Sequence, residues 1–368
     1  MGKHHTPLPD QAEKRPSRND VRKMALVMAA LAVFVIAMIA SYSGAFAKPT
    51  LHHLNVAVAG PQQLVDGIRG QETLGVTQVA DAAGAHDAVY QRTADAAFVV
   101  DAPGHLDVYV AGGGGRSVAN AAEAVGRGIA AKAGLTADVT DVAPTTAADP
   151  QGTVVFYAVI FLSIGASVGA TIFGRMMGSV RKPSTLAWRT LSLAAYSAVL
   201  AGGVTLYVDV VLGALTGHTW AVFGALFLYA IAVAGAVTGV AAAFGDVASA
   251  ALTAFLVVVG NAAAAGPVGK PLLTGFYTTL NAIVPQGSGV ALLRSVEYFG
   301  GNGAMTPIVT LGSWAAAGCV LAVGATAIRS GTLRRVLNYR ASHDGSHPAH
   351  SAGRDRTVLR PRVLSPVD

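Results

Sequence analysis

The stretch "GPVGKPLLTGFYTTLNAIVPQG" at residues 266–287 decides how the second half of the chain folds. It follows a long apolar run, which a Gly-Pro pair and a lysine interrupt. Apolar side chains then return at spacings of three and four residues, which predicts a short helix. Pro-Gln-Gly at 285–287 stops that helix. The segment is too broken to span a membrane and too apolar for a free loop.

The composition of the whole chain indicates a membrane protein. Of its 368 residues, 52% are hydrophobic and 12% are charged, whereas a soluble domain carries about a quarter charged residues. The single cysteine, Cys319, excludes an internal disulfide framework and a cysteine-rich metal cluster. The net charge of +6 does not require a nucleic-acid partner, because the positions of the basic residues have a better explanation.

Six stretches reach the length of about 20 mostly apolar residues that a membrane-spanning helix needs. They are residues 24–46, 153–174, 186–212, 220–244, 249–265 and 307–328. The first could instead be a signal peptide that ends with "AFA" before Lys48. Its apolar run is longer than the roughly 7–15 residues of a signal core, so we favour an uncleaved anchor.

The distribution of Lys and Arg predicts the orientation in the membrane. Six lie in the tail before the first helix, four in the connection at 175–189, and eight in the C-terminal tail. The 47–152 segment holds eleven Asp and Glu against six basic residues. We therefore expect a multi-pass protein of the plasma membrane, with both termini and the 175–189 loop in the cytoplasm. Residues 47–152 and 266–305 would lie outside.

The expected fold class is an α-helical polytopic membrane protein, with one helix, a small extracytoplasmic α/β domain and then five helices. The expected divisions are a basic cytoplasmic tail at 1–23, a first transmembrane helix at 24–46, the extracytoplasmic domain at 47–152, a five-helix domain at 153–330, and a basic disordered cytoplasmic tail at 331–368. With about 100 residues, the extracytoplasmic domain can hold a core of its own.

Alternation and turn residues predict the elements of that domain. Strands are expected at 54–60, 96–102, 106–113 and 135–144, with a hairpin turn "PGH" between the second and the third. Helices are expected at 61–70 and at 117–134, the latter with Ser117 as its N-cap.

Two features of the domain resemble ligand sites but favour plainer interpretations. The "AGGGGRSV" run at 111–118 lacks the G-x-x-x-x-G-K-[ST] pattern, so we interpret it as a strand-to-helix turn rather than a phosphate loop. His52 and His53 would point to opposite faces of a strand, which argues against a metal pair.

Motifs inside the apolar stretches favour packing over catalysis. "GASVG" at 165–169 matches the G-x-S-x-G nucleophile pattern, but that pattern needs a strand-to-helix turn and here it lies mid-helix. We interpret Gly165 and Gly169, and likewise Gly235 and Gly239, as small residues that let helices approach closely. No credible catalytic residue, metal ligand or cofactor motif is found, so an enzyme is not expected. "GPVGKP" also fails as a nucleotide loop.

Polar residues within the apolar stretches are candidate pathway residues, because burial in a membrane makes them costly. Asp209 lies near the outer interface, where a solvated carboxylate and a pathway role both remain open. Tyr207 and Asn261 are weaker candidates for hydrogen bonds between helices.

The broken segment is expected to form two short helices that dip into the outer leaflet, the second capped by Ser288. Irregular backbone at that depth is tolerated only inside protein or along a water-filled cavity. The break therefore predicts an outer gate or the roof of a cavity. The candidate gate residues are Pro267, Lys270, Pro271, Phe276, Tyr277, Pro285, Arg294 and Glu297.

This organisation resembles the type-2 ABC exporter permease class, and more narrowly its phage-infection-protein-like (YhgE/Pip-like) branch of Gram-positive bacteria. The residues that carry the likeness are "ADAAFVVDAPGHLDVYVAGG" and "GNAAAAGPVGK…VPQGSGVALLRSVEYFGG", within a similarity over about residues 24–330. The resemblance implies a homo- or heterodimer in the lipid bilayer, driven by a separate cytoplasmic ABC ATPase.

In such permeases a helix before the first span and the first cytoplasmic loop contact the ATPase. The matching positions are about 11–23 and 175–186, with Arg175, Arg181 and Lys182 as candidate contacts. Pro16 and a poor amphipathic face depart from the family pattern at the first of these positions.

The leading functional hypothesis is outward export of a lipid, a drug-like compound or a cell-envelope molecule. The alternative is a membrane scaffold or surface-binding protein that transports nothing and acts through residues 48–150.

Overall fold

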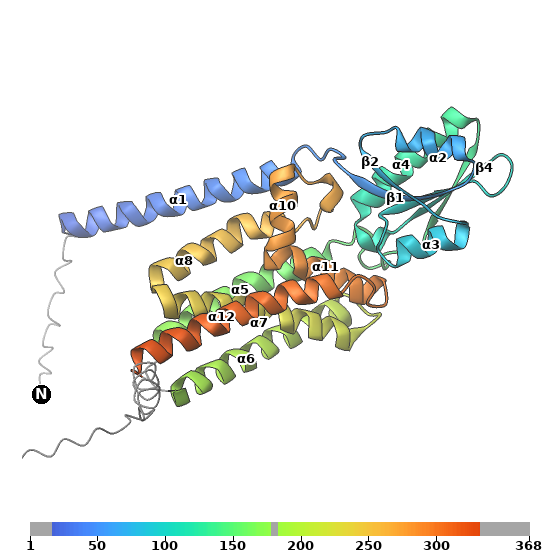
Figure 1. Ribbon diagram of the computed structural model, residues 1–368. Helices are drawn as coiled ribbons and strands as arrows, with labels where there is room; N and C mark the ends of the chain where they lie inside the picture. The colour runs from blue at the N-terminus through green and yellow to red at the C-terminus, as the bar shows by residue number, and fades with distance from the viewer. Residues whose placement is uncertain (1–16, 178–182, 332–368) are drawn as a thin grey trace, which may run out of the picture. The chain divides into compact units, whose positions relative to one another are not determined.

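The computed structural model describes residues 17–177 and 183–331 of the chain (Figure 1). Residues 1–326 form one compact unit, and the features below lie in it except for the last turn of the final helix. The described chain is mostly helical and contains one small mixed sheet.

Within the described ranges, six helices are long and apolar enough to cross a membrane, judged by length and composition. They are α1 (Arg18–Phe46), α5 (Val154–Met177), α6 (Pro183–Leu206) with the π-helical turn η2 (Tyr207–Val211), α7 (Thr219–Phe244), α8 (Asp246–Phe255) with the π-helical turn η3 (Leu256–Gly260) and α9 (Asn261–Ala263), and α12 (Met305–Arg329). All six predicted stretches are confirmed as helices, within a few residues at most ends.

The helices pack through small residues. The Tyr196 hydroxyl of α6 donates to the Gly165 carbonyl of α5 over 2.9 Å, and its ring occupies the space that a side chain at Gly169 would need. Gly239 of α7 lies against the backbone of Gly318 in α12. Both predicted pairs of small residues therefore lie where neighbouring helices meet, and they permit close approach in the way expected of small residues.

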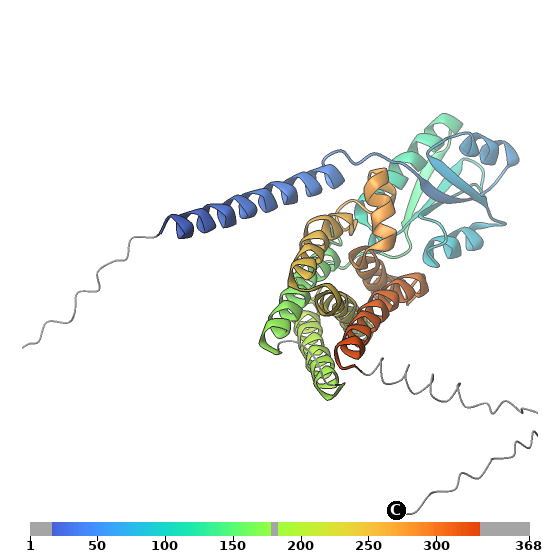
Figure 2. The same cartoon turned by 60° about the vertical axis from the view of Figure 1, so that its left-hand side comes forward.

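Helix α1 has little contact with the rest of the described chain. Its buried residues, Ser41 and Ala45, are both near its C-terminal end. There the Ser41 and Tyr277 hydroxyls lie 3.1 Å apart, and Tyr42 packs on Phe46. The remaining length of α1 exposes apolar side chains, and Figure 2 shows this part of the helix running apart from the other helices.

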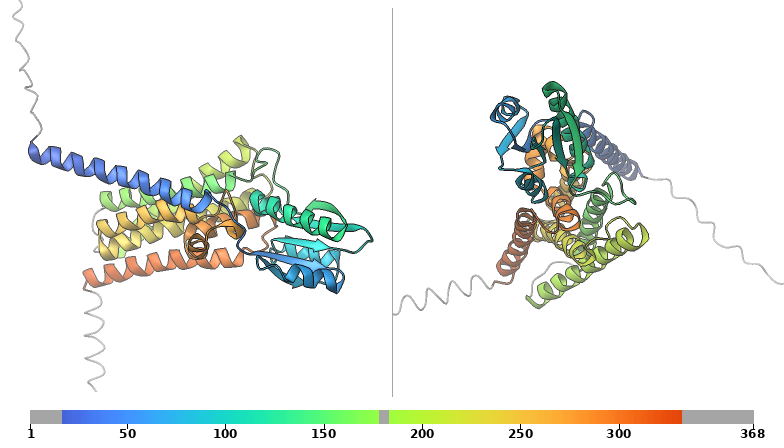
Figure 3. Two further views of the ribbon diagram at one scale, coloured as in Figure 1. Left: turned by 90° about the horizontal axis from the view of Figure 1, so that it is seen from above. Right: turned by 90° about the vertical axis from the view of Figure 1, so that its right-hand side faces the viewer.

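The α/β unit contains a five-stranded sheet in the order β2-β1-β3-β4-β5. Its strands are β1 (Leu54–Ala59), β2 (Leu74–Gln78), β3 (Ala96–Val99), β4 (His105–Val110) and β5 (Thr136–Asp141). β3 and β4 form the predicted antiparallel pair, and the other neighbours are parallel. Helices α2 (Gln62–Arg69) and α4 (Arg116–Ala133) share one core cluster with the sheet, and α3 (Ala82–Tyr90) belongs to the cluster on the other face (Figure 3).

Two elements of this unit, β2 and α3, are absent from the sequence prediction. β2 is short and only one of its residues is fully buried, so its apolar pattern is weak. α3 is rich in Ala and has little apolar periodicity, but Asp81 caps it by accepting from the Gly84 backbone N–H over 2.8 Å. An Asp at such a position is a recognised helix-start signal.

The prediction for the start of α4 is wrong. The helix begins at Arg116 with Gly115 as its N-cap, in a left-handed conformation (φ 141°) that favours glycine. The Ser117 hydroxyl instead donates to the Pro267 carbonyl over 2.8 Å. The Ser117 side chain therefore makes a tertiary hydrogen bond and does not cap the helix.

The broken segment forms the 3-10 turn η4 (Lys270–Leu272) and two short helices, α10 (Gly275–Ile283) and α11 (Pro285–Tyr298). Pro285 is the first residue of α11, so the prediction that it stops one helix is confirmed. The prediction that Ser288 caps the next helix is wrong. Proline suits the first helical position, because its fixed φ matches the helix and its missing N–H has no partner there.

Candidate functional site

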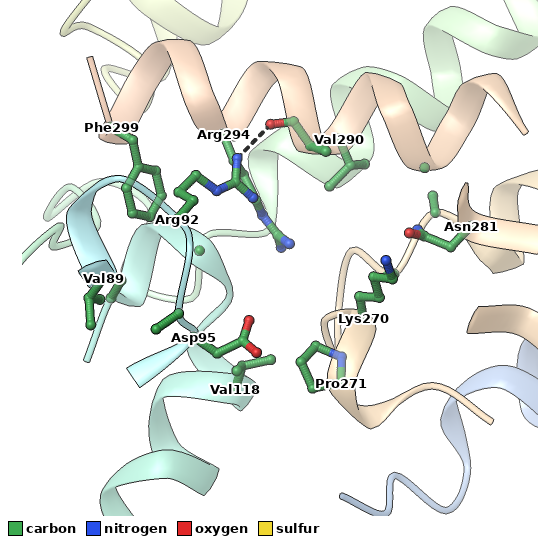
Figure 4. A pocket seen from close by; sticks show the side chains of 17 residues that line it. Val89, Arg92, Asp95, Val118, Lys270, Pro271, Asn281, Val290, Arg294 and Phe299 are labelled. Atoms are coloured by element: carbon green, nitrogen blue, oxygen red, sulfur yellow. Dashed lines mark hydrogen bonds between the residues drawn. The ribbon is translucent and has the colours of Figure 1, made fainter. Parts of the chain in front are cut away.

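The core of the α/β unit continues into the broken segment. One of its clusters includes Ala262, Ala265 and Leu272, and the other includes Phe299. Residues of both clusters line a cavity of about 170 Å³, the inner cavity (Figure 4). A larger cavity of about 550 Å³ shares part of that lining. The charged residues that line the inner cavity are Arg92, Asp95, Lys270 and Arg294.

Arg92 comes from the turn after α3 and ties the α/β unit to α11. Its Nη1 donates to the Ala291 carbonyl over 2.9 Å and to the Ser295 hydroxyl over 2.5 Å. Its guanidinium carbon lies 5.0 Å from the centre of the Phe299 ring, within range of a cation–π interaction. Arg92 has a φ of 62°, an uncommon value for a non-glycine residue.

Burial lowers the pKa of Arg92, and the charge of Asp95 opposes that shift. Asp95 precedes β3, and its Oδ2 accepts from the Asn55 backbone N–H over 2.9 Å. Burial raises the pKa of this carboxyl, and the Asn55 N–H together with the charges of Arg92 and Lys270 opposes the shift. The two side chains therefore interact electrostatically without forming a salt bridge in the described chain.

Arg294 of α11 lines the cavity and is only 5% exposed. Its Nη2 donates to the Gly266 carbonyl over 2.9 Å, the one hydrogen bond of this guanidinium within the described ranges. Burial lowers the pKa of Arg294 to about 10, and the charge of Arg92 acts in the same direction. Asp149 and Tyr298 oppose the shift. The side chain therefore stays charged at neutral pH.

Lys270 begins the turn η4 and completes the set of cations. Its ammonium forms no hydrogen bond or salt bridge with any described residue. In Figure 4 the Lys270 ammonium, the Arg294 guanidinium and the Asp95 carboxylate face the same space. Three cations and one carboxylate therefore line a single cavity.

The glycine run at 112–115 has a structural role in this site. A side chain at Gly113 would clash with the Tyr298 ring, and a Cβ at Gly115 would come within 3.5 Å of Arg294 Nη1. The run includes the turn η1 (Gly112–Gly114) between β4 and α4. It is therefore a strand-to-helix turn, as expected, and its glycines also let the α/β unit approach α11 closely.

The predicted gate residues divide into three groups. Lys270, Pro271 and Arg294 line the cavity, and Pro267 adjoins it through the hydrogen bond from Ser117. Phe276 and Tyr277 lie on α10, where Phe276 is 64% exposed and Tyr277 meets Ser41 of α1.

Pro285 and Glu297 form the third group, which is buried in α11 away from the cavity lining. Glu297 Oε1 accepts from the Gly217 backbone N–H over 2.9 Å, in the turn before α7. Its other carboxylate oxygen is buried and has no hydrogen-bond partner among the described residues.

The predicted intramembrane polar residues lie in or next to the two π-helical turns. The Thr219 hydroxyl donates to Asp209 in η2, so this carboxylate joins the ends of two helices. Tyr207, in the same turn, is exposed. Asn261 is 1% exposed directly after η3 and lies against Tyr42 of α1.

A buried polar contact that the sequence did not reveal supports η3. Gln286 of α11 is fully buried, and its Nε2 donates to the Leu256 carbonyl over 3.0 Å and to the Ser163 hydroxyl over 3.2 Å. Leu256 begins the π-helical turn, and its carbonyl also accepts the Asn261 backbone N–H. Gln286 therefore adds a second, tertiary donor to the carbonyl that begins the turn.

The predicted ATPase contacts can be placed only in part. Arg175 lies in the last turn of α5 and is exposed. Arg181, Lys182 and residues 11–16 lie outside the described residues.

Sequence reasoning missed Arg92 and Asp95, because it missed α3 and left both residues in an unassigned stretch. No group of three or more potential metal-ligating side chains occurs within the described ranges. Comparison with models of known families, with curated proteins and with solved structures finds no match to this chain.

Proposed function

We propose that this chain is the permease-like subunit of an ABC-type exporter in a bacterial plasma membrane. It would move a lipid, a drug-like compound or a cell-envelope molecule outward, as a homo- or heterodimer with a separate ATPase. The α/β unit would face the exterior and both termini the cytoplasm. The resemblance of residues 24–330 to that permease class is the starting point of the proposal.

The observation that carries the proposal is the charged cavity between the α/β unit and the broken segment. Arg294 is a buried charge with no salt-bridge partner among the described residues, and such a charge is costly and marks a candidate functional site. The cavity adjoins α11, which packs on α5 and α7 inside the helical part. With the α/β unit outside the cell, as proposed, a charged cavity beside this packing would suit the outer end of a transport path.

In the transport cycle, the contacts between the α/β unit and the segment that includes α11 would break in the open state and form again in the closed state. Beside the apolar packing of Phe299, the polar contacts with α11 are those of Arg92 with Ala291 and Ser295. The hydrogen bond from Ser117 to Pro267 holds the unit to the residues before η4. Hydrogen bonds of this kind contribute about 0.5–3 kcal/mol each, so they can break and reform in a transport cycle.

The experiment places a photo-crosslinking amino acid at Met176, an exposed side chain at the α5 end of the predicted ATPase loop. In native membranes we expect an ultraviolet-dependent adduct, which mass spectrometry would identify as an ATPase that carries a Walker A motif. The matched control is Trp220, whose side chain is similarly exposed. It lies in the first turn of α7, beyond the C-terminal end of α6, whereas Met176 precedes the N-terminal end of α6.

A Met176 adduct with such an ATPase, absent from Trp220, would support the proposal. The same labelling at both positions, or no ATPase at either, would contradict it.

A further inference from the structure

We propose that the cavity lined by Arg92, Lys270 and Arg294 binds a phosphate-type oxyanion that belongs to a larger molecule. The inference rests on the proposed function only in treating that molecule as the exporter's cargo. Binding itself requires no ATPase and no transport.

The first step is charge. Three cationic side chains and the single carboxylate of Asp95 line the inner cavity, so the lining is positive overall. Neither Lys270 nor the two arginines form a salt bridge within the described chain. The charge of Asp149 raises the pKa of Arg294, but Asp149 forms no salt bridge with it in the described chain. Its carboxylate oxygens instead accept from the backbone N–H groups of Thr153 and Val154 at the start of α5. An anion in the cavity would supply the missing counter-charge.

The second step is the supply of hydrogen-bond donors. A guanidinium has five N–H groups. Arg92 donates through Nη1 and Arg294 through Nη2, so each retains N–H groups without a partner among the described residues. The Lys270 ammonium adds three more donors. Two guanidinium forks and one ammonium suit the several oxygens of a phosphate better than a single carboxylate.

The third step is size. The inner cavity of about 170 Å³ exceeds several times the roughly 10–15 Å³ of cavity volume that one water molecule needs, which leaves room for an oxyanion with a short substituent. The larger cavity of about 550 Å³ shares Arg92, Asp95 and Lys270 with it, and threonine and histidine side chains are among its other lining residues. The head would therefore lie among the cations and the rest of the ligand would extend into the larger cavity. Val118, Val290 and Phe299 supply apolar contacts around the head.

The test measures binding to the purified full-length chain without any ATPase. Glycerol 1-phosphate, titrated by calorimetry, represents a soluble phosphate ester. Phosphatidylglycerol represents a lipid headgroup, and native mass spectrometry would compare it with diacylglycerol, which has the same acyl chains and no phosphate. Either probe would support the shared chemistry, and the one that binds more tightly would identify the source of the phosphate.

The most informative variant is Lys270→Gln, because the lost ammonium holds no other residue in place and the variant should fold. It should weaken binding of the better probe about ten-fold. The matched control is Lys132→Gln, which removes an exposed lysine from α4 outside this cavity and should leave binding unchanged.

A second variant, Asp95→Asn, tests the sign of the effect. The amide keeps the shape and can still accept from the Asn55 N–H, but the negative charge is gone. Phosphate binding should tighten about five-fold, because the repulsion between carboxylate and ligand is removed. A merely structural role for Asp95 predicts no tightening.

The inference is overturned if the wild-type chain binds neither probe, if Lys270→Gln and Lys132→Gln behave alike, or if Asp95→Asn weakens binding. An ATPase adduct at Met176 without phosphate binding would remove this inference and leave the proposed function. Phosphate binding without an ATPase adduct at Met176 would support this inference and contradict the proposed function.

Discussion

Helices α10 and α11 are adjacent in the chain, yet their relation to the protein interior is opposite. α10 carries Phe276, Tyr277 and Leu280, but none of its residues is fully buried. α11 carries Gln286, Arg294 and two serines, and eleven of its fourteen residues are buried. In a water-soluble protein the more apolar helix would be the buried one.

The difference indicates what surrounds each helix. Where lipid replaces water, an apolar exterior costs nothing, and small and polar residues gather where helices meet. α11 follows this pattern, because it packs on α5 and α7 and its Gln286 and Arg294 bind carbonyls of other segments. The exposed apolar face of α10 suits a lipid-facing position. The first three of the following substitutions test this comparison, and the fourth tests a charge that faces α11 across the cavity; they run from the largest expected effect to the smallest.

Leu293→Ala should cause the largest loss of stability. Leu293 is fully buried in α11, and emptying such a site costs about 2–5 kcal/mol of the free energy of unfolding. Phe276→Ala on α10 should cost far less, since that ring is 64% exposed. Thermal unfolding of both variants in detergent would compare them. A larger loss for Phe276→Ala would reverse the roles assigned to the two helices.

Gly287→Ala should rank second. The added methyl group would clash with the Asn281 backbone carbonyl, which cannot move away cheaply, so we expect a loss of about 1–3 kcal/mol. Gly275→Ala at the start of α10 meets nothing within 4 Å and should be neutral or slightly stabilising. The same unfolding assay applies, and equal effects would show that α11 is not packed as described.

Gln286→Leu should cost about 1–2 kcal/mol, because the Leu256 carbonyl and the Ser163 hydroxyl would lose a buried donor. Hydrogen exchange at η3 should increase in this variant. Thr279→Leu, on the exposed side of α10, is the control and should change neither quantity. Unchanged exchange at η3 in Gln286→Leu would rule out a supporting role for this side chain.

Asp95→Asn should give the smallest change, and it should depend on pH. Burial raises the pKa of this carboxyl, so folding favours its neutral form. Stability is then greatest below the ordinary carboxyl pKa and falls as the pH rises toward the raised value. The variant should be more stable than the wild type at neutral pH, by less than about 1 kcal/mol, and equal to it in acid. A wild type that is more stable at neutral pH would contradict the assigned cause of the shift.

The sequence by itself determined the six long helices, because about 20 consecutive apolar residues leave few alternatives to a helix. It also determined the central antiparallel strand pair and the helix break at Pro285, since alternation and proline geometry are local properties. Gly165, Gly169, Gly235 and Gly239 were found for the same reason, since a four-residue spacing places both members of a pair on one helix face.

Only the tertiary structure decided which charges share a cavity. Arg92 and Asp95 meet Lys270 and Arg294 across about 200 residues of chain, through a short helix whose Ala-rich sequence gave a weak signal. The tertiary structure also decided that α11 is buried and α10 is not. Helix periodicity describes one helix at a time and does not show which helices pack against it. Which face is covered depends on the neighbouring helices, and those are set by packing across the whole chain.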